Sequence, residues 1–344
     1  MKKKNNLGRG FLNRQDFLKL SGFLVIGLVL GSLTNMPLSQ AKDIYPSGKI
    51  TFIVAHSAGG AVDMFARAIS PYISKYLKEG SPEVQGGDIL IRNEAAAAGR
   101  KGYNMMYNAK PDGYTIGSVD SSVVTDNFLE TPEIDYTKFT YLSRAYIIMR
   151  VIITPAKGFK NWDEVVNEMK KGPIKMGVGA FGRGNHVSAI ILNEKVGTRF
   201  KLIPFPGLAE TMGALIRGDV QVAFTGENAA IPLIDANEVR VLLVFSATSE
   251  RPGVVTIRQL GSPELAEQFS TYRFIIAPPG LETEKKNILI AAIKKATADP
   301  EFVDWAKKAK VQLAGLYGSE AENVFLKQVK FFEDIAPILT KHLK

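Results

Sequence analysis

Short runs of apolar, mostly β-branched residues alternate with helical stretches through most of this chain. Two parallel strands need a crossover segment between them, usually a helix, so this alternation predicts α/β domains with mainly parallel sheets. Helices are expected between the runs, for example at Trp162–Lys171, where Asn161 and Glu164 form a capping-box pattern. The expected strands are Ile50–Ala55, Ile89–Arg92, Tyr114–Val119, Ile147–Thr154, Lys175–Val178, Lys201–Phe205, Val220–Phe224 and Val239–Phe245.

The last quarter of the chain departs from this alternation. Glu282–Ala298, Pro300–Lys310 and Ser319–Lys341 all have helical patterns, with little strand expected between them. The chain is also longer than a single hydrophobic core usually supports, which predicts two domains. No low-complexity linker separates them, so we expect the chain to cross between domains within the extended segments Leu142–Val151 and Ser270–Ala277.

The N-terminal segment has the pattern of an export signal. Basic residues precede the short apolar run Phe23–Leu33, and Ser39-Gln40-Ala41 offers small residues for a signal peptidase. The run is short for a transmembrane helix, although a permanent anchor is the alternative. Gln15 replaces the second arginine of a twin-arginine motif, which favours the general secretory route. We therefore predict a periplasmic protein cleaved after Ala41, with residues 1–41 as signal peptide, 42–144 plus 272–344 as domain 1, and 145–271 as domain 2.

Charge and cysteine content exclude several classes of function. The formal net charge is +9, and the segment up to Ala41 holds much of that excess, so the remainder is too mildly basic to indicate nucleic-acid binding. Cysteine is absent, which removes disulfides, thiolate nucleophiles and an acylated lipoprotein anchor. His186 has no second metal ligand at a suitable spacing, so a capping or packing role is expected. We expect a monomer without metal or cofactor.

The segment Ile50–Arg67 predicts an anion-binding turn. An apolar strand runs into a glycine-containing turn, and a helix follows at once, so backbone N–H groups and the helix N-terminus favour a carboxylate, sulfate or phosphate. Asp63, in the first helical turn, either pairs with Arg67 four residues on or faces the ligand. The candidate binding residues here are Ser57, Ala58, Gly59, Gly60 and Asp63.

Further loops of the same strand-to-helix kind follow along the chain. The loop Asn93–Gly102 is expected beside the first one, because carboxyl ends of parallel strands share one sheet edge. A second group follows later strands, and there Arg183 either reaches a ligand carboxylate or lies on the surface. The candidates in this second group are Phe181, Gly182, Arg183, Phe205, Thr225 and Glu227.

A serine hydrolase is a remote alternative. Ala55-His56-Ser57-Ala58-Gly59 nearly matches the Gly-x-Ser-x-Gly nucleophile elbow in the required strand–turn–helix context. Ala55 replaces the first glycine, however, and the catalytic histidine would have to be His186 or His342. The last of these lies two residues from the C-terminus. We therefore expect a binding protein rather than an enzyme.

Several motifs, in order and spacing, resemble the Bug/TctC family, the extracytoplasmic solute receptors of tripartite tricarboxylate transporters. The similarity runs from about Tyr45 to the C-terminus. The matching residues are Tyr45-Pro46-Ser47-Gly48-Lys49-Ile50, Gly59-Gly60-x-x-Asp63-x-x-Ala66-Arg67, Asn93 with Gly99 and Gly102, Pro111-Asp112-Gly113-Tyr114-Thr115, Pro204-Phe205-x-Gly207, Leu215-x-x-Gly218-Asp219-Val220 and Ala277-Pro278-x-Gly280.

The resemblance implies a type II periplasmic-binding-protein fold that closes on a small organic carboxylate and delivers it to membrane permease subunits. A receptor that serves a signalling partner is the alternative. In the family, two loops of the first domain hold a ligand carboxylate, and they correspond here to Ser57–Gly60 and to the segment of Ala96, Ala97, Ala98 and Gly99. The family usually has Pro-Gly-Ala-Gly-Gly in the second loop, where this chain has Ala95–Gly99. If either substituted position needs a positive φ, alanine costs about 1 kcal/mol or more there.

Overall fold

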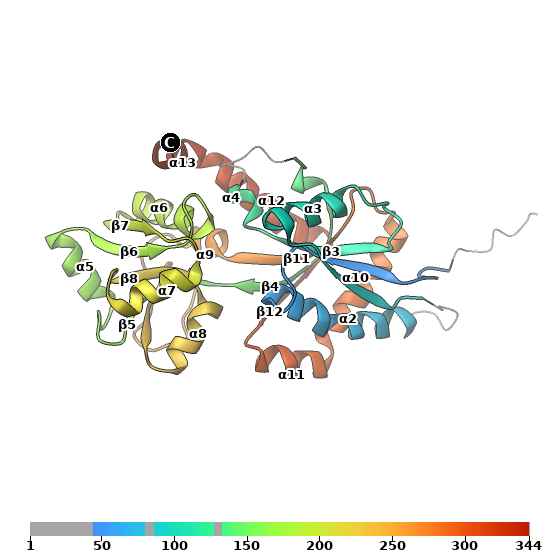
Figure 1. The fold of residues 1–344 in the computed structure, drawn as a ribbon, viewed down its shortest axis with the longest axis horizontal. Coiled ribbons are helices and arrows are strands. Elements are labelled where there is room, and N and C mark those ends of the chain that lie inside the picture. The colour runs from blue at the N-terminus through green and yellow to red at the C-terminus, as the bar shows by residue number, and fades with distance from the viewer. Residues whose placement is uncertain (1–43, 80–85, 127–132, 344) are drawn as a thin grey trace, which may run out of the picture. The chain divides into compact units, whose positions relative to one another are not determined.

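Two six-stranded sheets organise the protein (Figure 1). The computed structural model describes residues 44–79, 86–126 and 133–343, so the predicted signal peptide and its cleavage site lie outside the described residues. The first sheet has the order β12-β4-β11-β3-β1-β2 and the second β10-β9-β5-β8-β6-β7. The strands are β1 (Ile50–Val54), β2 (Ile89–Asn93), β3 (Thr115–Asp120), β4 (Thr140–Ile148), β5 (Arg150–Pro155), β6 (Ile174–Val178), β7 (Phe200–Pro204), β8 (Val222–Gly226), β9 (Val239–Val244), β10 (Val255–Thr256), β11 (Thr271–Ala277) and β12 (Gln312–Tyr317).

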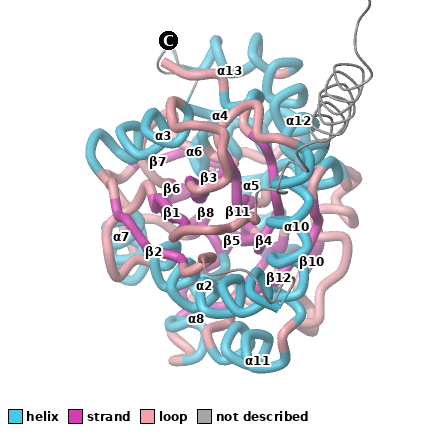
Figure 2. The backbone as a smooth tube through the Cα atoms, turned by 90° about the vertical axis from the view of Figure 1, so that its right-hand side faces the viewer, coloured by secondary structure: helices cyan, strands magenta, loops and turns pink. Residues whose placement is uncertain are grey.

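Helices flank these strands, as Figure 2 shows for the magenta strands among cyan helices. No described helix is long and apolar enough to cross a membrane. The helices are α2 (Ala61–Glu79), η1 (Ala96–Gly99), α3 (Arg100–Tyr107), α4 (Val123–Asp126), η2 (Tyr136–Lys138), α5 (Trp162–Lys171), α6 (Gly184–Val196), α7 (Leu208–Arg217), α8 (Glu227–Asp235), α9 (Glu264–Phe269), α10 (Thr283–Ala298), α11 (Pro300–Lys308), α12 (Ser319–Asp334) and α13 (Ala336–Leu343).

Some elements begin where local sequence signals place them, but the predicted strand Ile147–Thr154 is wrong: it covers the end of β4 and most of β5, which belong to different sheets. The Asn161 side chain accepts a hydrogen bond from the Glu164 N–H at 3.0 Å, which confirms the predicted start of α5. The long C-terminal helix predicted over Ser319–Lys341 is instead two helices that break at Ile335. Pro337 explains the break, because it lacks the N–H that an uninterrupted helix would need there.

The first sheet is assembled from both ends of the chain. β1 pairs in parallel with β2 and β3, whereas β11 runs antiparallel to β3 and β4. The expectation of little strand in the last quarter is wrong at β12, which pairs antiparallel with β4. β12 lies at the sheet edge with its residues partly exposed, so it lacks the apolar alternation by which strands are recognised.

The second sheet is formed by one continuous segment. β6 pairs in parallel with β7 and β8, and β5 runs antiparallel to β8 and β9. The chain leaves the first sheet between β4 and β5, with Met149 alone between the strands, and returns through Ser270 between α9 and β11. These two passages, named here the crossovers, lie within the segments predicted from the sequence.

The hydrophobic core extends across both sheets. One cluster of buried residues includes Phe274 of the first sheet and Phe224 of the second, and residues 44–344 form one compact unit. The buried residues Phe325 and Phe332 of α12 belong to the same cluster. Phe269 of α9 packs on Phe245, with ring centroids 5.3 Å apart, so α9 is anchored on the second sheet just before the return crossover.

Candidate functional site

The first loop, residues 56–60, is held by the carboxylate of Asp63. This side chain is only 3 % exposed. One oxygen accepts hydrogen bonds from the Gly59 N–H at 2.8 Å and from Arg67 Nε at 2.9 Å. The other accepts from Asn93 Nδ2 at 2.9 Å. The pairing of Asp63 with Arg67 is thus confirmed, and the carboxylate fastens the loop to the end of β2.

These hydrogen bonds also keep the Asp63 carboxylate ionised and fix the direction in which the backbone N–H groups of the loop point. The hydrogen bond from Arg67, with those from Gly59 and Asn93, lowers the pKa of Asp63 to about 2 despite burial. The Gly59 N–H is engaged by Asp63, and the Gly60 N–H contacts the Ser57 carbonyl at 3.3 Å. These two N–H groups therefore point into the loop and are not free for a ligand. Ser57, Ala58 and Gly59 are nevertheless exposed residues.

The second loop packs against the first. Gly99 has a φ of +89°, and a Cβ placed there would lie 2.5 Å from the Ala55 carbonyl oxygen. Glycine is therefore required at this position for both backbone angle and space. Ala97 has a φ of +53°, so one alanine of the altered loop does occupy the left-handed region. Ala96 is exposed, and the side chain of Ala98 lies outside the described residues.

Replacing Ala97 by glycine is expected to raise the free energy of unfolding by about 0.5–1 kcal/mol. The left-handed conformation costs an L-residue about 1–2 kcal/mol, and the greater freedom of glycine in the unfolded chain offsets part of the relief. Urea unfolding measures the difference. Ala95→Gly is the control, because Ala95 has an ordinary φ of −86°. If Ala97→Gly lost as much stability as the control Ala95→Gly, the inference that the backbone of Ala97 is strained would be contradicted.

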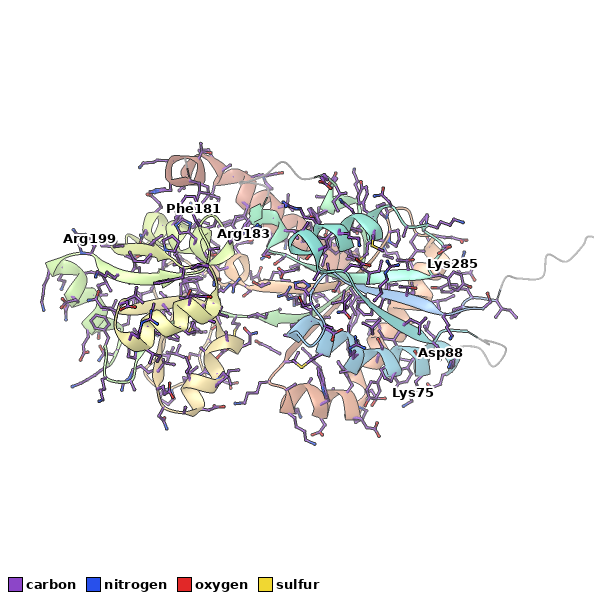
Figure 3. All side chains as sticks on the ribbon, viewed as in Figure 1. Lys75, Asp88, Phe181, Arg183, Arg199 and Lys285 are labelled. Atoms are coloured by element: carbon purple, nitrogen blue, oxygen red, sulfur yellow. The ribbon has the colours of Figure 1, made fainter. Side chains whose placement is uncertain are left out.

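The loop between β6 and α6 carries three of the predicted residues, of which Phe181 and Arg183 are labelled in Figure 3. Phe181 is 53 % exposed and contacts the ring of His186, with centroids 4.9 Å apart. His186 is buried, and its Nδ1 accepts a hydrogen bond from the Gly182 N–H at 2.9 Å. Of the predicted capping or packing role, His186 thus has the packing one: it is buried and holds the loop at Gly182, and burial lowers its pKa. Arg183 occupies the N-cap position of α6.

The remaining predicted residues are less available to a ligand. Thr225 is completely buried, and Phe205 packs partly buried against the core of the second sheet. The Glu227 carboxylate forms an ion pair with Arg251, and its N–H donates to the Met149 carbonyl at 2.8 Å. Glu227 therefore fastens the start of α8 to the first crossover.

Sequence reasoning missed a polar cluster where the two sheets meet. Asp120, at the end of β3, forms an ion pair with Arg273 of β11, and both side chains are largely buried, at 11 % and 15 % exposure. The Asp120 carboxylate also accepts from the Ser122 N–H at 2.7 Å. Burial opposes ionisation, yet the Arg273 guanidinium and this hydrogen bond hold the pKa of Asp120 below its usual value.

A second arginine completes this cluster. Arg150 begins β5, and its Nε donates to the Phe269 carbonyl at 3.2 Å while Nη2 donates to Thr271 Oγ1. Burial lowers the pKa of Arg150 to about 10, so it stays charged at neutral pH. The available signal was the arginines inside the two predicted crossover segments, Arg144 and Arg150 in the first and Arg273 in the second. A single sequence does not tell such an arginine from one that points to solvent.

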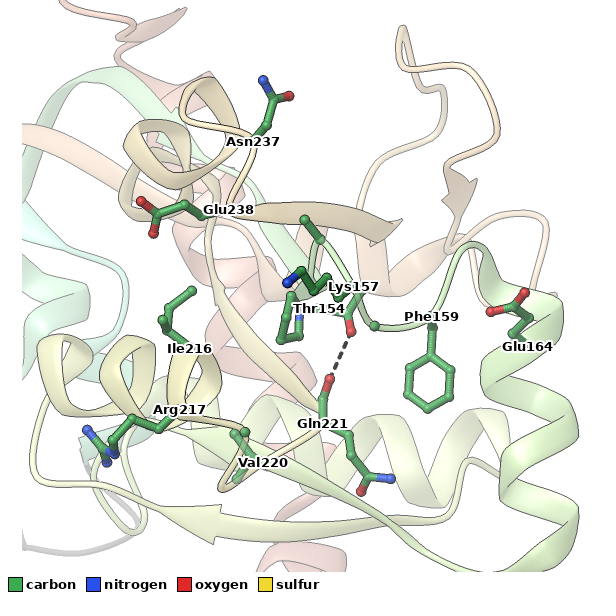
Figure 4. Close-up of a pocket in the computed structure, with 14 residues that line it drawn as sticks. Thr154, Lys157, Phe159, Glu164, Ile216, Arg217, Val220, Gln221, Asn237 and Glu238 are labelled. Carbon is green, nitrogen blue, oxygen red and sulfur yellow. Dashed lines mark hydrogen bonds between the residues drawn. The ribbon is translucent and has the colours of Figure 1, made fainter.

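A separate pocket lies on the second sheet (Figure 4). Its volume is about 840 Å³, and the side chains of Phe159, Ile216 and Gln221 contribute to its wall. None of the predicted binding residues lines it. Among the described residues no group of three or more histidine or acidic side chains could hold a metal ion.

Comparisons with known proteins agree with this architecture. Residues 73–329 match the family model of the tripartite tricarboxylate transporter family receptor, TctC. A UPF0065 protein from the tcbD-tcbE intergenic region of Pseudomonas sp. strain P51 is 27 % identical over 301 residues, covering 85 % of this chain and 86 % of its own. A ligand-free TctC solute-binding protein from Polaromonas has a TM-score of 0.73 at 22 % identity, covering 87 % of this chain and all of its own.

Two further solved structures carry small acids. MatC from Rhodopseudomonas palustris, with bound malate, has a TM-score of 0.63 at 20 % identity and covers 85 % of this chain and 100 % of its own. R. palustris Rpa4515, with adipate, has a TM-score of 0.64 at 20 % identity and covers 86 % of this chain and 98 % of its own. At these identities the likeness shows the two-lobed periplasmic-binding-protein fold.

Proposed function

This chain belongs to the family of tripartite tricarboxylate transporter receptors, and from that premise we propose that it captures a small organic carboxylate and delivers it to the permease subunits of such a transporter. The family consists of solute-binding receptors, which are not enzymes. The near match of Ser57 to a nucleophile elbow therefore has no catalytic meaning here.

The observation that carries this proposal is the joining of two strand-to-helix loops at the carboxyl ends of β1 and β2. Gly99 of the second loop packs on Ala55, and Asn93 donates both to Asp63 and to the His56 carbonyl, the latter at 3.2 Å. A loop pair fixed in this way presents a preorganised surface beside the N-terminus of α2, which favours an anion. The malate and adipate held by two structural neighbours support a carboxylate as the ligand class.

The same proposal covers the movement and the location of the protein. We infer that residues 42–144 plus 272–344 and residues 145–271 act as two rigid parts that close on the ligand about the crossovers. Contacts from both parts supply the free energy that favours the closed state. The receptor acts as a periplasmic monomer after cleavage behind Ala41. Loss of uptake of the identified carboxylate in a deletion strain, restored by the gene, tests delivery to a permease.

A thermal-shift screen of the mature protein tests the ligand class directly. Malate, adipate, hexanoate, simple amines and neutral sugars are compared at equal concentration. A rise in melting temperature confined to carboxylates is expected, because only they complement the N-terminus of α2 beside the loops. A rise with neutral sugars alone would overturn the proposed function.

Replacing Gly59 by valine is expected to weaken carboxylate binding at least about tenfold while the protein remains folded. Gly59 has a φ of +78°, where an L side chain costs about 1–2 kcal/mol, so the exposed loop would shift. Calorimetric titration measures the affinity. Gly197→Val is the matched control: Gly197 has a φ of +75° and, like Gly59, no described atom within 4 Å of an added Cβ, but it ends α6. Unchanged affinity in the Gly59 variant would contradict the loop assignment.

A further inference from the structure

His56 is the first residue of the first loop, and its side chain lies partly inside the protein. The residue is partly exposed, whereas its Nδ1 atom is buried and has no hydrogen-bond partner among the described residues. Its carbonyl accepts from Asn93 Nδ2 at 3.2 Å, so the backbone beneath the ring is fixed to the end of β2. One ring nitrogen thus lies in the interior, and solvent reaches another part of the residue.

The buried nitrogen lies near charged groups at the edge of the first sheet. Val54, two residues before His56, is paired with Ser118 of β3. Further along β3, Asp120 is paired with Arg273 of β11. Burial and the positive charge of Arg273 lower the pKa of His56, and Asp120 has the opposite, smaller effect. His56 is therefore neutral at neutral pH, and a neutral imidazole carries its proton on only one nitrogen.

The neighbouring groups decide which nitrogen carries that proton. Both oxygens of Asp120 are engaged, one by the Ser122 N–H at 2.7 Å and the other by Arg273. The groups left over can donate: Arg273 Nε and the Ser118 hydroxyl are buried without a partner among the described residues. A buried nitrogen near unused donors and a guanidinium is favoured as an acceptor. The proton of His56 then lies on Nε2.

The first loop has fewer free donors than its glycines suggest. The Gly59 N–H donates to Asp63, and the Gly60 N–H contacts the Ser57 carbonyl. A carboxylate accepts several hydrogen bonds and is held best by donors that are already fixed in place. A ring N–H at the first position of the loop, oriented by buried groups rather than by the loop itself, supplies such a donor.

We propose that His56 is a ligand-binding residue whose Nε2–H donates a hydrogen bond to the solute carboxylate at the loops of residues 56–60 and 96–99. The inference rests on the proposed function, in which these loops hold a carboxylate. Ser118 and Arg273 are positioning residues, because they keep the inner nitrogen of His56 an acceptor without touching the solute. The neutral ring adds a donor to the loop without adding a charge.

Substitutions at His56 separate the donor from the ring. Adipate, malate and hexanoate are titrated calorimetrically, and melting temperatures show that each variant is folded. His56→Phe keeps a planar ring without a donor and should weaken binding about 10- to 100-fold, as expected for one hydrogen bond to a charged group. His56→Gln supplies an amide N–H and should stay within about threefold of wild type. His342→Phe is the matched control, since His342 contacts Glu194 of α6 instead, and should leave the affinities unchanged.

A spectroscopic measurement covers the case in which His56→Phe does not fold. The chain has three histidines, so labelling them with ¹⁵N gives few ring signals, and the spectra of His56→Gln and His342→Phe assign them. We expect the wild-type ring of His56 to be protonated on Nε2 at neutral pH, and its Nε2 signal to shift when the acids bind. Protonation on Nδ1, or a signal that bound acid does not move, would overturn the inference.

The outcomes separate the two proposals. If wild-type protein binds these acids and His56→Phe binds them equally well, the inference is overturned and the proposed function stands. An equal loss in His56→Phe and His56→Gln would also overturn it, because the shape of the ring and not its N–H would then be required. If wild-type protein binds none of these acids and no other carboxylate, the proposed function fails, and the inference fails with it.

Discussion

Replacing Asp120 by asparagine is expected to lower the free energy of unfolding by about 3–5 kcal/mol, because it leaves the buried Arg273 without its counter-charge. The nearby Arg150 adds to the effect, since it is a second positive group with no carboxylate of its own among the described residues. Urea unfolding followed by circular dichroism measures the loss. Asp219→Asn removes a carboxylate from the exposed pair with Arg217 and should cost under about 1 kcal/mol. A similar small loss in both variants would contradict a buried ion pair.

The ion pair of Asp120 also predicts a dependence on pH. Its pKa is lowered in the folded protein, so its contribution to stability is present above the pKa of the unfolded chain, about 4. The contribution is lost as the pH falls through the lower folded pKa. The difference in stability between wild-type protein and Asp120→Asn should therefore shrink below about pH 4. A difference that stays constant down to about pH 2 would exclude this linkage.

Replacing Asp63 by alanine is expected to lower the free energy of unfolding by about 2–3 kcal/mol and to weaken ligand binding. Three hydrogen-bond donors converge on this carboxylate: the Gly59 N–H, Arg67 Nε and Asn93 Nδ2. The change leaves all three without their acceptor. The first loop would lose its attachment to β2, and its freedom in the unbound state would oppose binding. Chemical unfolding and calorimetric titration together measure both effects.

The matched control for Asp63 is Asp304, which forms an i,i+4 pair with Lys308 on an exposed helix surface. Asp304→Ala should change stability by less than about 0.5 kcal/mol and leave binding unaltered. The folded pKa of Asp63, about 2, also means that its stabilisation persists to acid pH and disappears only as the pH falls from about 4 towards 2. Equal effects of the two substitutions would show that the loop does not depend on Asp63.

The positions of the loops followed from the sequence, but the direction of their donors did not. Strand–turn–helix patterns placed the loops of residues 56–60 and 96–99 at one sheet edge, and the β1–β2 pairing brings their strands together. The sequence suggested free N–H groups at Gly59 and Gly60, yet these groups are used within the loop. The spacing of Asp63 and Arg67, four residues apart, allows them to pair. It does not show that Asn93, at the end of a distant strand, will also donate to Asp63.

The second loop, with its alanines, is another case in which the sequence predicted the position of a loop but not its backbone conformation. Its alanines raised the question of a strained backbone, and Ala97 does have a positive φ. Neither the number of alanines nor their spacing identified which one would be strained. The loop also has to bring Gly99 against the Ala55 carbonyl oxygen, a contact between distant segments that no local pattern reveals. A short helical turn between fixed ends leaves little choice of backbone angle.

The sequence by itself determined most of the strand and helix order, though not β12 or the break between α12 and α13. It also determined the positions of the loops and crossovers and the family, because these depend on local periodicity and on ordered motifs. Only the tertiary structure decided that Arg150, Asp120 and Arg273 would gather in one largely buried place. Asp120 and Arg273 are 153 residues apart and meet because β11 lies next to β3 in the sheet. Strand order across a sheet depends on the packing of the whole chain, and no local pattern encodes which distant charges it will bring together.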